Sequence, residues 1–315
     1  MDTSPVSVAE ILHGDRRALA RAITLAESTR HDHRQQAESL LAALLPHTGG
    51  SIRVGISGPP GVGKSTFIES LGMMLIAQGH KVAVLAVDPS SRRSGGSILG
   101  DKTRMETLGR EPNAFIRPSP AGITLGGVAR HTREVVLLCE AAGFDVVIVE
   151  TVGVGQSETA VSKLTDCFVL LVNPGGGDDL QGIKRGIMEL ADLVIVTKAD
   201  GALLGPARIS AADYGAALHL MRPKWPDAFP SVLMTSIPLQ QGVTEMWDAV
   251  TSFIDLRREN GQLETLRSDQ ARAALWDELV AATVDKLRAD HRLDELEAQV
   301  AAGQLLPATA ARLIG

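Results

Sequence analysis

The chain has 315 residues, of which 44% are hydrophobic and 22% charged, and its formal net charge is -6. This composition is ordinary for a globular protein, and the length suffices for one large domain with appendages. The acidic balance argues against a nucleic-acid partner, no apolar run reaches the length of a membrane span, and the first residues start no secretory signal. Cys139 and Cys167 stand in apolar patterns, which predicts buried free thiols in a cytoplasmic protein.

Residues 1–48 predict a helical N-terminal extension. Ser7 to Glu10 fits a capping box, Gly14 fits a helix stop, and Asp15 is expected to cap a second helix. A third helix is expected to follow, carrying Leu40, Leu41, Leu44 and Leu45.

A phosphate-binding loop is the strongest single motif. Residues 58–65 read Gly-Pro-Pro-Gly-Val-Gly-Lys-Ser and match the pattern G-x-x-x-x-G-K-[ST], between an apolar strand and a predicted helix. Glycines let backbone amides surround an oligophosphate, and the helix dipole favours anions. Lys64 would reach the terminal phosphates, facing solvent without them, and the Ser65 hydroxyl would bind Mg²⁺. The expected nucleotide contacts of the loop are Gly58, Pro59, Pro60, Gly61, Val62, Gly63, Lys64, Ser65 and Thr66.

Strands and helices alternate from residue 51 to residue 236. Several of the apolar runs are continuous, as in strands that are covered on both faces. The pattern predicts an α/β fold with a mainly parallel sheet flanked by helices, in a central domain over residues 49–258. The strands are expected at 52–57, 82–87, 114–117, 145–150, 167–173, 192–197 and 231–235.

Acidic residues stand at the ends of two of these strands. Asp88 and Glu150 are expected near Mg²⁺, because this ion prefers oxygen ligands, and helix capping is the alternative for each. The Gly/Ser-rich segment that follows Asp88 is either a switch loop or a plain surface loop, and within it Asp101 is the candidate second acid near the metal.

Two further segments resemble motifs of GTP-binding switch proteins. Residues 150–153, Glu-Thr-Val-Gly, resemble D-x-x-G, in which the Gly153 amide would donate to the γ-phosphate, and Gln156 could orient the attacking water. Residues 197–200, Thr-Lys-Ala-Asp, resemble the guanine reader N-K-x-D. Asp200 would accept hydrogen bonds from guanine, which adenine cannot donate, while the stem of Lys198 lies over the base.

The guanine reader departs from its pattern at one position. Thr197 replaces the asparagine, and we expect this to remove a brace between the base loop and the phosphate loop. The segment after the last strand, with Ser236, Ile237 and Pro238, is expected to back the base with loop amides.

Residues 259–315 predict a C-terminal helical arm. Its long helix carries an apolar stripe that could pack on the chain's own core or on a second copy, and the pattern leaves both open. The stripe consists of Leu275, Leu279, Val280, Thr283, Val284 and Leu287.

Taken together, the motifs resemble the MeaB/ArgK-type GTPases, bacterial relatives of the human methylmalonic aciduria type A protein. The resemblance rests on seven segments in order: GPPGVGKST, AVDPSS, GGSILGDKTRM, FIRPSP, GGVA, ETVGVGQSE and LQGIK. It implies a P-loop GTPase of the SIMIBI class that binds GTP or GDP with Mg²⁺. It also implies a chaperone role for an adenosylcobalamin-dependent acyl-CoA mutase, usually methylmalonyl-CoA mutase, and a homodimer built through the C-terminal arm.

The resemblance also assigns a third switch to residues 174–184. Asp178, Asp179 and Lys184 are charges there that could pair with the nucleotide site or with the mutase, and the alternative is a glycine-rich loop followed by a helix cap.

Two rival functions remain open. Some members of the family have been described as ATPases or kinases of periplasmic amino-acid transport, which would require a preference for ATP. A metallochaperone GTPase would share the sheet and the phosphate loop, but such proteins usually carry a histidine-rich stretch or a cysteine pair, and neither is found here.

Overall fold

The computed structural model describes residues 6–87, 105–118, 125–151, 157–175, 185–221, 224–225 and 230–314. The chain forms two compact units, Met1–Leu263 and Glu264–Gly315.

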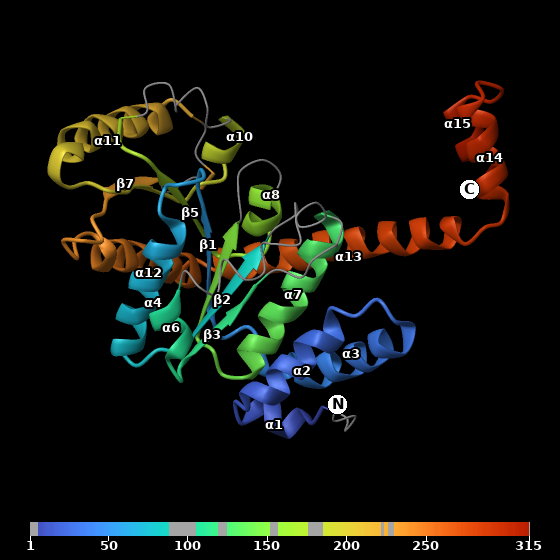
Figure 1. The fold of residues 1–315 in the computed structure, drawn as a ribbon, viewed down its shortest axis with the longest axis horizontal. Coiled ribbons are helices and arrows are strands. Elements are labelled where there is room, and N and C mark those ends of the chain that lie inside the picture. Colours follow the sequence, from blue (N-terminus) through green and yellow to red (C-terminus); the bar gives the residue numbers. More distant parts are fainter. Residues whose placement is uncertain are drawn as a thin grey trace. The chain divides into compact units, whose positions relative to one another are not determined.

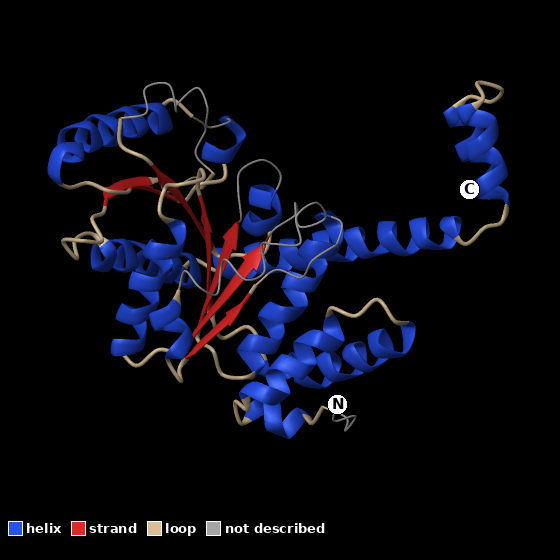
Figure 2. Ribbon diagram, in the orientation of Figure 1, coloured by secondary structure: helices blue, strands red, loops and turns tan. Residues whose placement is uncertain are grey.

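A seven-stranded parallel sheet forms the centre of the first unit (Figures 1 and 2). Its strand order is β3-β2-β4-β1-β5-β6-β7, and every neighbouring pair is parallel. All seven predicted strands are confirmed to within about one residue at each end. Their bounds are β1 Ile52–Ser57, β2 Val82–Val87, β3 Ala114–Arg117, β4 Val146–Thr151, β5 Cys167–Val172, β6 Leu193–Val196 and β7 Ser231–Met234.

Helices cover both faces of the sheet, and their side chains complete two cores. One core joins the sheet to α7, α8, α10 and α11, with α1, α2 and α3 packed against α7, and the other joins it to α4, α6 and α12. These helices are α1 Val8–Leu12, α2 Arg16–Ala26, α3 His31–Leu44, α4 Lys64–Ala77, α6 Glu106–Arg110, α7 Leu125–Ala141, α8 Ser157–Ser162, α10 Arg185–Met188, α11 Leu204–His219 and α12 Val243–Glu259. Two short 3₁₀ helices are η1 Leu45–His47 and η2 Gly201–Leu203.

Strand residues alternate between the two cores. In β4, Val147 and Val149 face one core, while Val146 and Ile148 face the other. Both faces are therefore apolar, which explains the continuous runs of valine, leucine and isoleucine. Cys139 and Cys167 are buried and free, as predicted, and burial raises the pKa of both thiols.

Most of the predicted N-terminal signals are confirmed. Gly14 has a φ of 77°, and the Asp15 carboxylate accepts hydrogen bonds from the amides of Arg17 and Ala18 at 2.8 and 2.7 Å. The capping box at Ser7 was wrong, since α1 has only five residues and Ser7 makes no side-chain cap.

The third helix ends one residue earlier than predicted. α3 ends at Leu44, and Leu45, which is 58% exposed, begins the short 3₁₀ helix η1 that contains Pro46.

The second unit consists of the rest of α13 Gln262–Arg288 together with α14 Arg292–Ala301 and α15 Pro307–Ile314. Pro307 opens α15, as predicted. The predicted stripe on α13 is largely exposed within the chain, at 58% for Leu275, 47% for Leu279 and 61% for Val280. No helix in the described part of the chain is long and apolar enough to span a bilayer.

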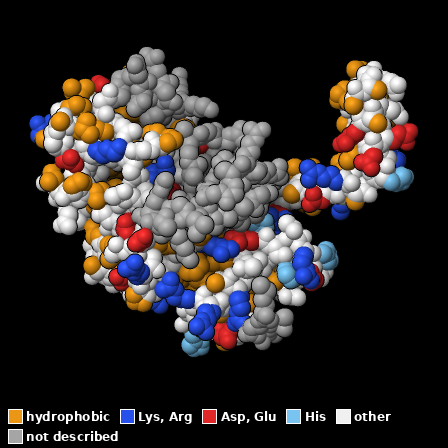
Figure 3. All heavy atoms as spheres, viewed as in Figure 1, with side chains coloured by type: hydrophobic (Ala, Val, Ile, Leu, Met, Phe, Trp, Pro, Cys, Tyr) orange, Lys and Arg blue, Asp and Glu red, His pale blue; other side chains and the backbone are white. Residues whose placement is uncertain are grey.

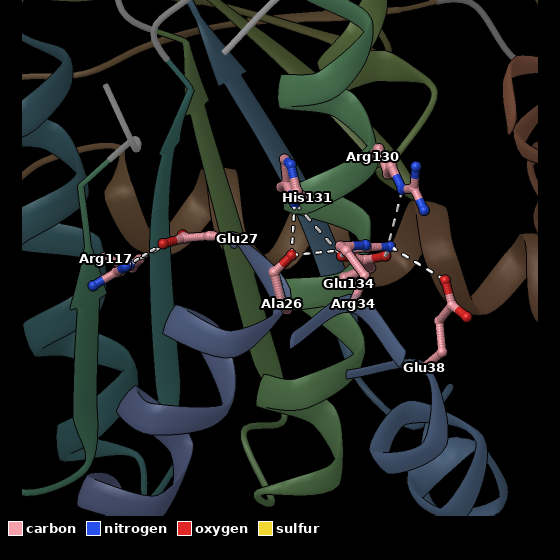
Figure 4. A network of polar contacts seen from close by, with 8 residues as sticks. All are labelled: Ala26, Glu27, Arg34, Glu38, Arg117, Arg130, His131 and Glu134. Carbon is pink, nitrogen blue, oxygen red and sulfur yellow. Dashed lines mark hydrogen bonds and ion pairs between the residues drawn. The ribbon is translucent and has the colours of Figure 1, made fainter. Parts of the chain in front are cut away.

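An ionic clasp joins the N-terminal helices to the sheet layer (Figure 4). The guanidinium of Arg34 on α3 binds both carboxylate oxygens of Glu134 on α7, at 3.0 and 2.9 Å, and also donates to the carbonyl of Ala26 at 2.8 Å. His131 Nδ1 donates to the same carbonyl at 2.9 Å. A second ion pair joins Glu27, after α2, to Arg117 at the end of β3. The extension is thus anchored to α7 and to the end of β3.

The Arg34–Glu134 pair predicts a stability difference that depends on pH. Burial alone would raise the pKa of Glu134, but hydrogen bonds from His131 and Arg34 and the charge of Arg34 outweigh it and lower this pKa. Glu134→Ala should reduce the free energy of unfolding by about 2–3 kcal/mol at neutral pH, since it leaves a half-buried guanidinium without its partner.

Urea denaturation at several pH values would measure this difference. Because folding lowers the pKa of Glu134, its ion pair stabilises the protein fully at pH values above the carboxyl pKa of the unfolded chain. This stabilisation is lost as the pH falls through the lower pKa that Glu134 has in the folded protein. The gap between native protein and variant should therefore shrink in acid. Glu38→Ala is the control, because this side chain is 64% exposed and lies 3.9 Å from Arg34. Equal losses for both variants would contradict the prediction.

Candidate functional site

The phosphate loop lies at the carboxyl end of β1, the middle strand of the sheet, and leads directly into α4. Gly58 passes so close to β5 that a Cβ there would come within 2.5 Å of the Leu171 carbonyl oxygen. Gly63 has a left-handed φ of 98° and forms the N-terminal cap of α4. Glycine is thus needed at 58 for close approach and at 63 for conformation.

Lys64 is drawn onto the phosphate loop. Its ammonium group donates to the carbonyls of Gly58 at 2.7 Å and Pro59 at 3.2 Å, and the residue is half-buried. The prediction that Lys64 faces solvent was therefore wrong, because the loop itself supplies acceptors. The positive charge is held at the loop, where a phosphate oxygen could replace these carbonyls.

Glu150 is brought beside the phosphate loop by the sheet register. It pairs with Ile56 across β4 and β1 and is 4% exposed, near the carboxyl edge where α4 begins at Lys64, with Ser65 in its first turn. The adjacent Thr151 hydroxyl donates to Ser57 at 2.8 Å and ties the two strand ends together. A carboxylate and a hydroxyl are oxygen donors that suit Mg²⁺.

The remaining predicted metal and phosphate contacts are not among the residues that the structure describes. Asp88, Asp101, Gly153, Gln156 and Lys184 lie outside the described residues. Within the described ranges no three His, Cys, Asp or Glu side chains form a metal-binding group.

The predicted base loop and its backing turn lie together at the carboxyl ends of β6 and β7. The Ala199 amide donates to the Thr235 carbonyl at 2.9 Å, and the Ser236 hydroxyl donates to Asp200 Oδ2 at 2.5 Å. The same hydroxyl accepts from the Leu239 amide at 3.3 Å, so Ile237 and Pro238 lie within the turn that orients the Asp200 carboxylate.

Thr197 itself braces the base loop to the phosphate loop. The expectation that replacing asparagine by threonine removes this brace was wrong. Its hydroxyl lies 2.9 Å from the Val62 carbonyl and 3.2 Å from that of Val172, and the residue is 5% exposed. Thr197, directly after β6, lies close enough to the phosphate loop for its short side chain to reach it. Its hydroxyl therefore makes the link to Val62 that was expected of an asparagine amide.

Lys198 makes a second link between the two loops. Its backbone is left-handed, with a φ of 54°, and its ammonium group donates to the Gly61 carbonyl at 2.6 Å and to Asn173 Oδ1 at 3.2 Å. Sequence reasoning missed Asn173. The available signal was its position directly after a strand whose end lies at the same edge of the sheet.

The parallel sheet, the glycine-rich loop between β1 and α4, and the base loop after β6 together define a P-loop nucleoside triphosphatase fold with helical extensions. The sequence-based fold prediction is thus confirmed.

Comparison with known proteins identifies the family. The profile described as "Methylmalonyl Co-A mutase-associated GTPase MeaB" matches residues 19–292. A probable GTPase of Mycobacterium tuberculosis is 54% identical over 305 residues, covering 96% of this chain and 91% of that protein. The mouse protein named methylmalonic aciduria type A homolog, mitochondrial, is 47% identical over 318 residues, covering 96% of this chain and 77% of the mouse protein. The chain belongs to the MeaB family and is a GTPase.

A solved structure supports the same fold. The protein named LAO/AO transport system kinase superposes with a TM-score of 0.78 at 38% identity, over 98% of this chain and 94% of its own.

The Thr197 brace can be tested by removing its hydroxyl alone. Thr197→Val keeps the side-chain shape but leaves the Val62 carbonyl without this donor, so GTP should bind about five- to tenfold more weakly. Titration of a fluorescent GTP analogue measures the change. Thr197→Ser retains the hydroxyl and should bind within about twofold of the native protein. If the valine variant binds as tightly as the serine variant, the brace does not support nucleotide binding.

Proposed function

We propose that this GTPase is a G-protein chaperone that gates cobalamin loading and protects an adenosylcobalamin-dependent acyl-CoA mutase, with methylmalonyl-CoA mutase as the expected client. Family membership over residues 19–292 carries the proposal, because the family is described by its association with that mutase. The joined phosphate and base loops support it, since a switch protein needs nucleotide state and protein conformation to be coupled.

The phosphate loop would hold the phosphates of GTP and GDP. Its amides and Lys64 would stabilise negative charge on the transferring phosphoryl group. Ser65 and Glu150 would hold Mg²⁺, which neutralises phosphate charge when bound. Asp88 and Asp101 are proposed as further acids near the metal, Gly153 as a γ-phosphate contact and Gln156 as a water-orienting residue.

The base loop would select guanine. Ser236 occupies one carboxylate oxygen of Asp200 and fixes the plane of the group, so that the carboxylate can accept from guanine. Lys198, anchored at its ammonium group, would offer its alkyl stem as a platform for the base.

The third-switch residues Asp178, Asp179 and Lys184 would relay the nucleotide state to the mutase. The described chain before them is anchored, because the Gly175 amide donates to the Ser210 hydroxyl on α11 at 3.0 Å. A client that binds one nucleotide state better must also change nucleotide affinity.

A homodimer is also proposed, with the C-terminal arm at its interface. The exposed stripe of Leu275, Leu279 and Val280 supports it, since a run of exposed apolar side chains on one helix is typical of an interface. A sedimentation mass of one chain at micromolar concentration would exclude this dimer. We further propose that the protein acts in the cytoplasm, which suits its free buried cysteines.

The kinase alternative has one supporting observation, since the similar solved structure is that of a protein named as a transport system kinase. The arrangement around Asp200 favours guanine instead. The metallochaperone alternative would need a metal-binding group, and the described residues contain none with three or more His, Cys, Asp or Glu.

The guanine assignment predicts a change of base preference. Asp200→Asn should weaken GTP binding by at least about tenfold and favour xanthosine triphosphate, because the acceptor is partly replaced by a donor. Competition between GTP, ATP and xanthosine triphosphate for a fluorescent nucleotide measures the order. If the native protein binds ATP as tightly as GTP, the base-reading assignment fails and the kinase alternative gains support.

The chaperone assignment predicts that a cognate mutase changes the GTPase cycle. Addition of the adenosylcobalamin-dependent mutase should raise the rate of phosphate release from GTP, as expected of a slow GTPase that a partner completes. Lys64→Ala with mutase is the control and should show no turnover. If neither turnover nor nucleotide affinity responds to the mutase, the proposed client is wrong.

A further inference from the structure

Asn173 lies beside the guanine reader although it follows another strand, β5. Val172 and Val196 are register partners in β5 and β6, so Asn173 and Thr197, the residues that follow them, leave the sheet side by side. From this position Asn173 Oδ1 reaches the ammonium group of Lys198 at 3.2 Å. Since an ammonium group only donates, the side-chain carbonyl of Asn173 must face it.

The backbone around Asn173 is held on both sides. Before it, the Val172 carbonyl accepts from the Thr197 amide at 2.9 Å. After it, the Gly175 amide donates to Ser210, which is 6% exposed on α11. The carboxamide of Asn173 therefore extends from a short anchored segment, as a positioning group requires.

The replacement of asparagine by Thr197 in the N-K-x-D motif explains why a carboxamide at position 173 is useful. The Thr197 hydroxyl has a single proton, and its near acceptors are the carbonyls of Val62 and Val172. It is therefore committed to the brace. Lys198 takes its acceptors elsewhere, from Gly61 in the phosphate loop and from Asn173 on the neighbouring strand.

We propose that Asn173 is a positioning residue for guanine recognition, and that Thr197 and Asn173 together replace the single asparagine of the guanine-reading motif. Thr197 braces the phosphate loop, and Asn173 fixes the end of Lys198 so that its stem stays over the base. The inference rests on the proposed assignment of Lys198 and Asp200 to the base. It adds Asn173, the residue after β5, to a motif whose other residues all lie in the loop after β6.

The main test compares Asn173→Ala with Asn173→Asp in the full-length protein. Loss of one acceptor for an ammonium group at a partly exposed position should weaken GTP binding about three- to tenfold. The Michaelis constant for GTP should rise by the same factor while kcat stays unchanged, because Asn173 touches no reacting atom. The aspartate variant keeps an oxygen at the same place and should bind GTP within about twofold of the native protein. Asn260→Ala, an exposed asparagine after α12, is the matched control.

A transfer of the carboxamide tests the replacement itself. The double variant Asn173→Ala/Thr197→Asn restores the asparagine to the motif position and should bind GTP more tightly than Asn173→Ala alone. Native-like binding by Asn173→Ala would overturn the inference, as would equal losses in the alanine and aspartate variants. A double variant no better than the single one, with an unchanged thermal midpoint, would also overturn it.

The Asp200→Asn competition separates this inference from the proposed function. If Asp200→Asn leaves base preference unchanged, the assignment of the base loop fails, and this inference fails with it. If Asp200→Asn shifts preference toward xanthine while Asn173→Ala binds GTP normally, only the role of Asn173 is refuted.

Discussion

Two consecutive carbonyls of the phosphate loop hold the nucleotide site together. The Gly61 carbonyl accepts from Lys198 and the Val62 carbonyl accepts from Thr197, so the loop after β1 is tied to the loop after β6. Because β5 lies between these strands in the sheet, its end is drawn into the same contacts through Val172 and Asn173. The phosphate loop and the proposed base-reading loop are therefore one connected structure. A movement of the base loop must therefore shift the backbone of the phosphate loop at Gly61 and Val62.

The N-terminal helices extend this connected structure to the opposite part of the sheet. Their ionic clasp reaches Arg117 at the end of β3 and Glu134 in the middle of α7. Half-buried ion pairs of this kind contribute through their geometry, since each would leave a costly unpaired charge if its partner were removed. The extension therefore behaves as part of the compact unit that carries the nucleotide site, and the described structure includes it in that unit.

The base-loop motif has lost its asparagine, but the folded chain still makes hydrogen bonds at the positions where the asparagine is expected to act. Asparagine at position 197 would combine a donor and an acceptor in one side chain. Here a threonine hydroxyl reaches the phosphate loop, and an asparagine from the neighbouring strand reaches Lys198. The surface view shows apolar side chains gathered over α11, and Ile209 of this helix is 65% exposed (Figure 3). The same helix carries the buried Ser210, whose hydroxyl accepts from the Gly175 amide and anchors the chain just after Asn173.

The sequence alone determined the fold class, all seven strands, the phosphate loop and the family, because these depend on local spacing and on apolar runs that are read along the chain. It also located the Asp15 cap and the stop at Gly14, which depend on neighbouring residues only. Tertiary structure decided the links between loops: the brace made by Thr197 and the contact of Asn173 with Lys198. These involve residues that are far apart in sequence, such as Val62 and Thr197, and they exist only because parallel strands bring their carboxyl ends to one edge. A motif read letter by letter reports a missing asparagine, whereas the folded chain supplies its hydrogen bonds from two strands.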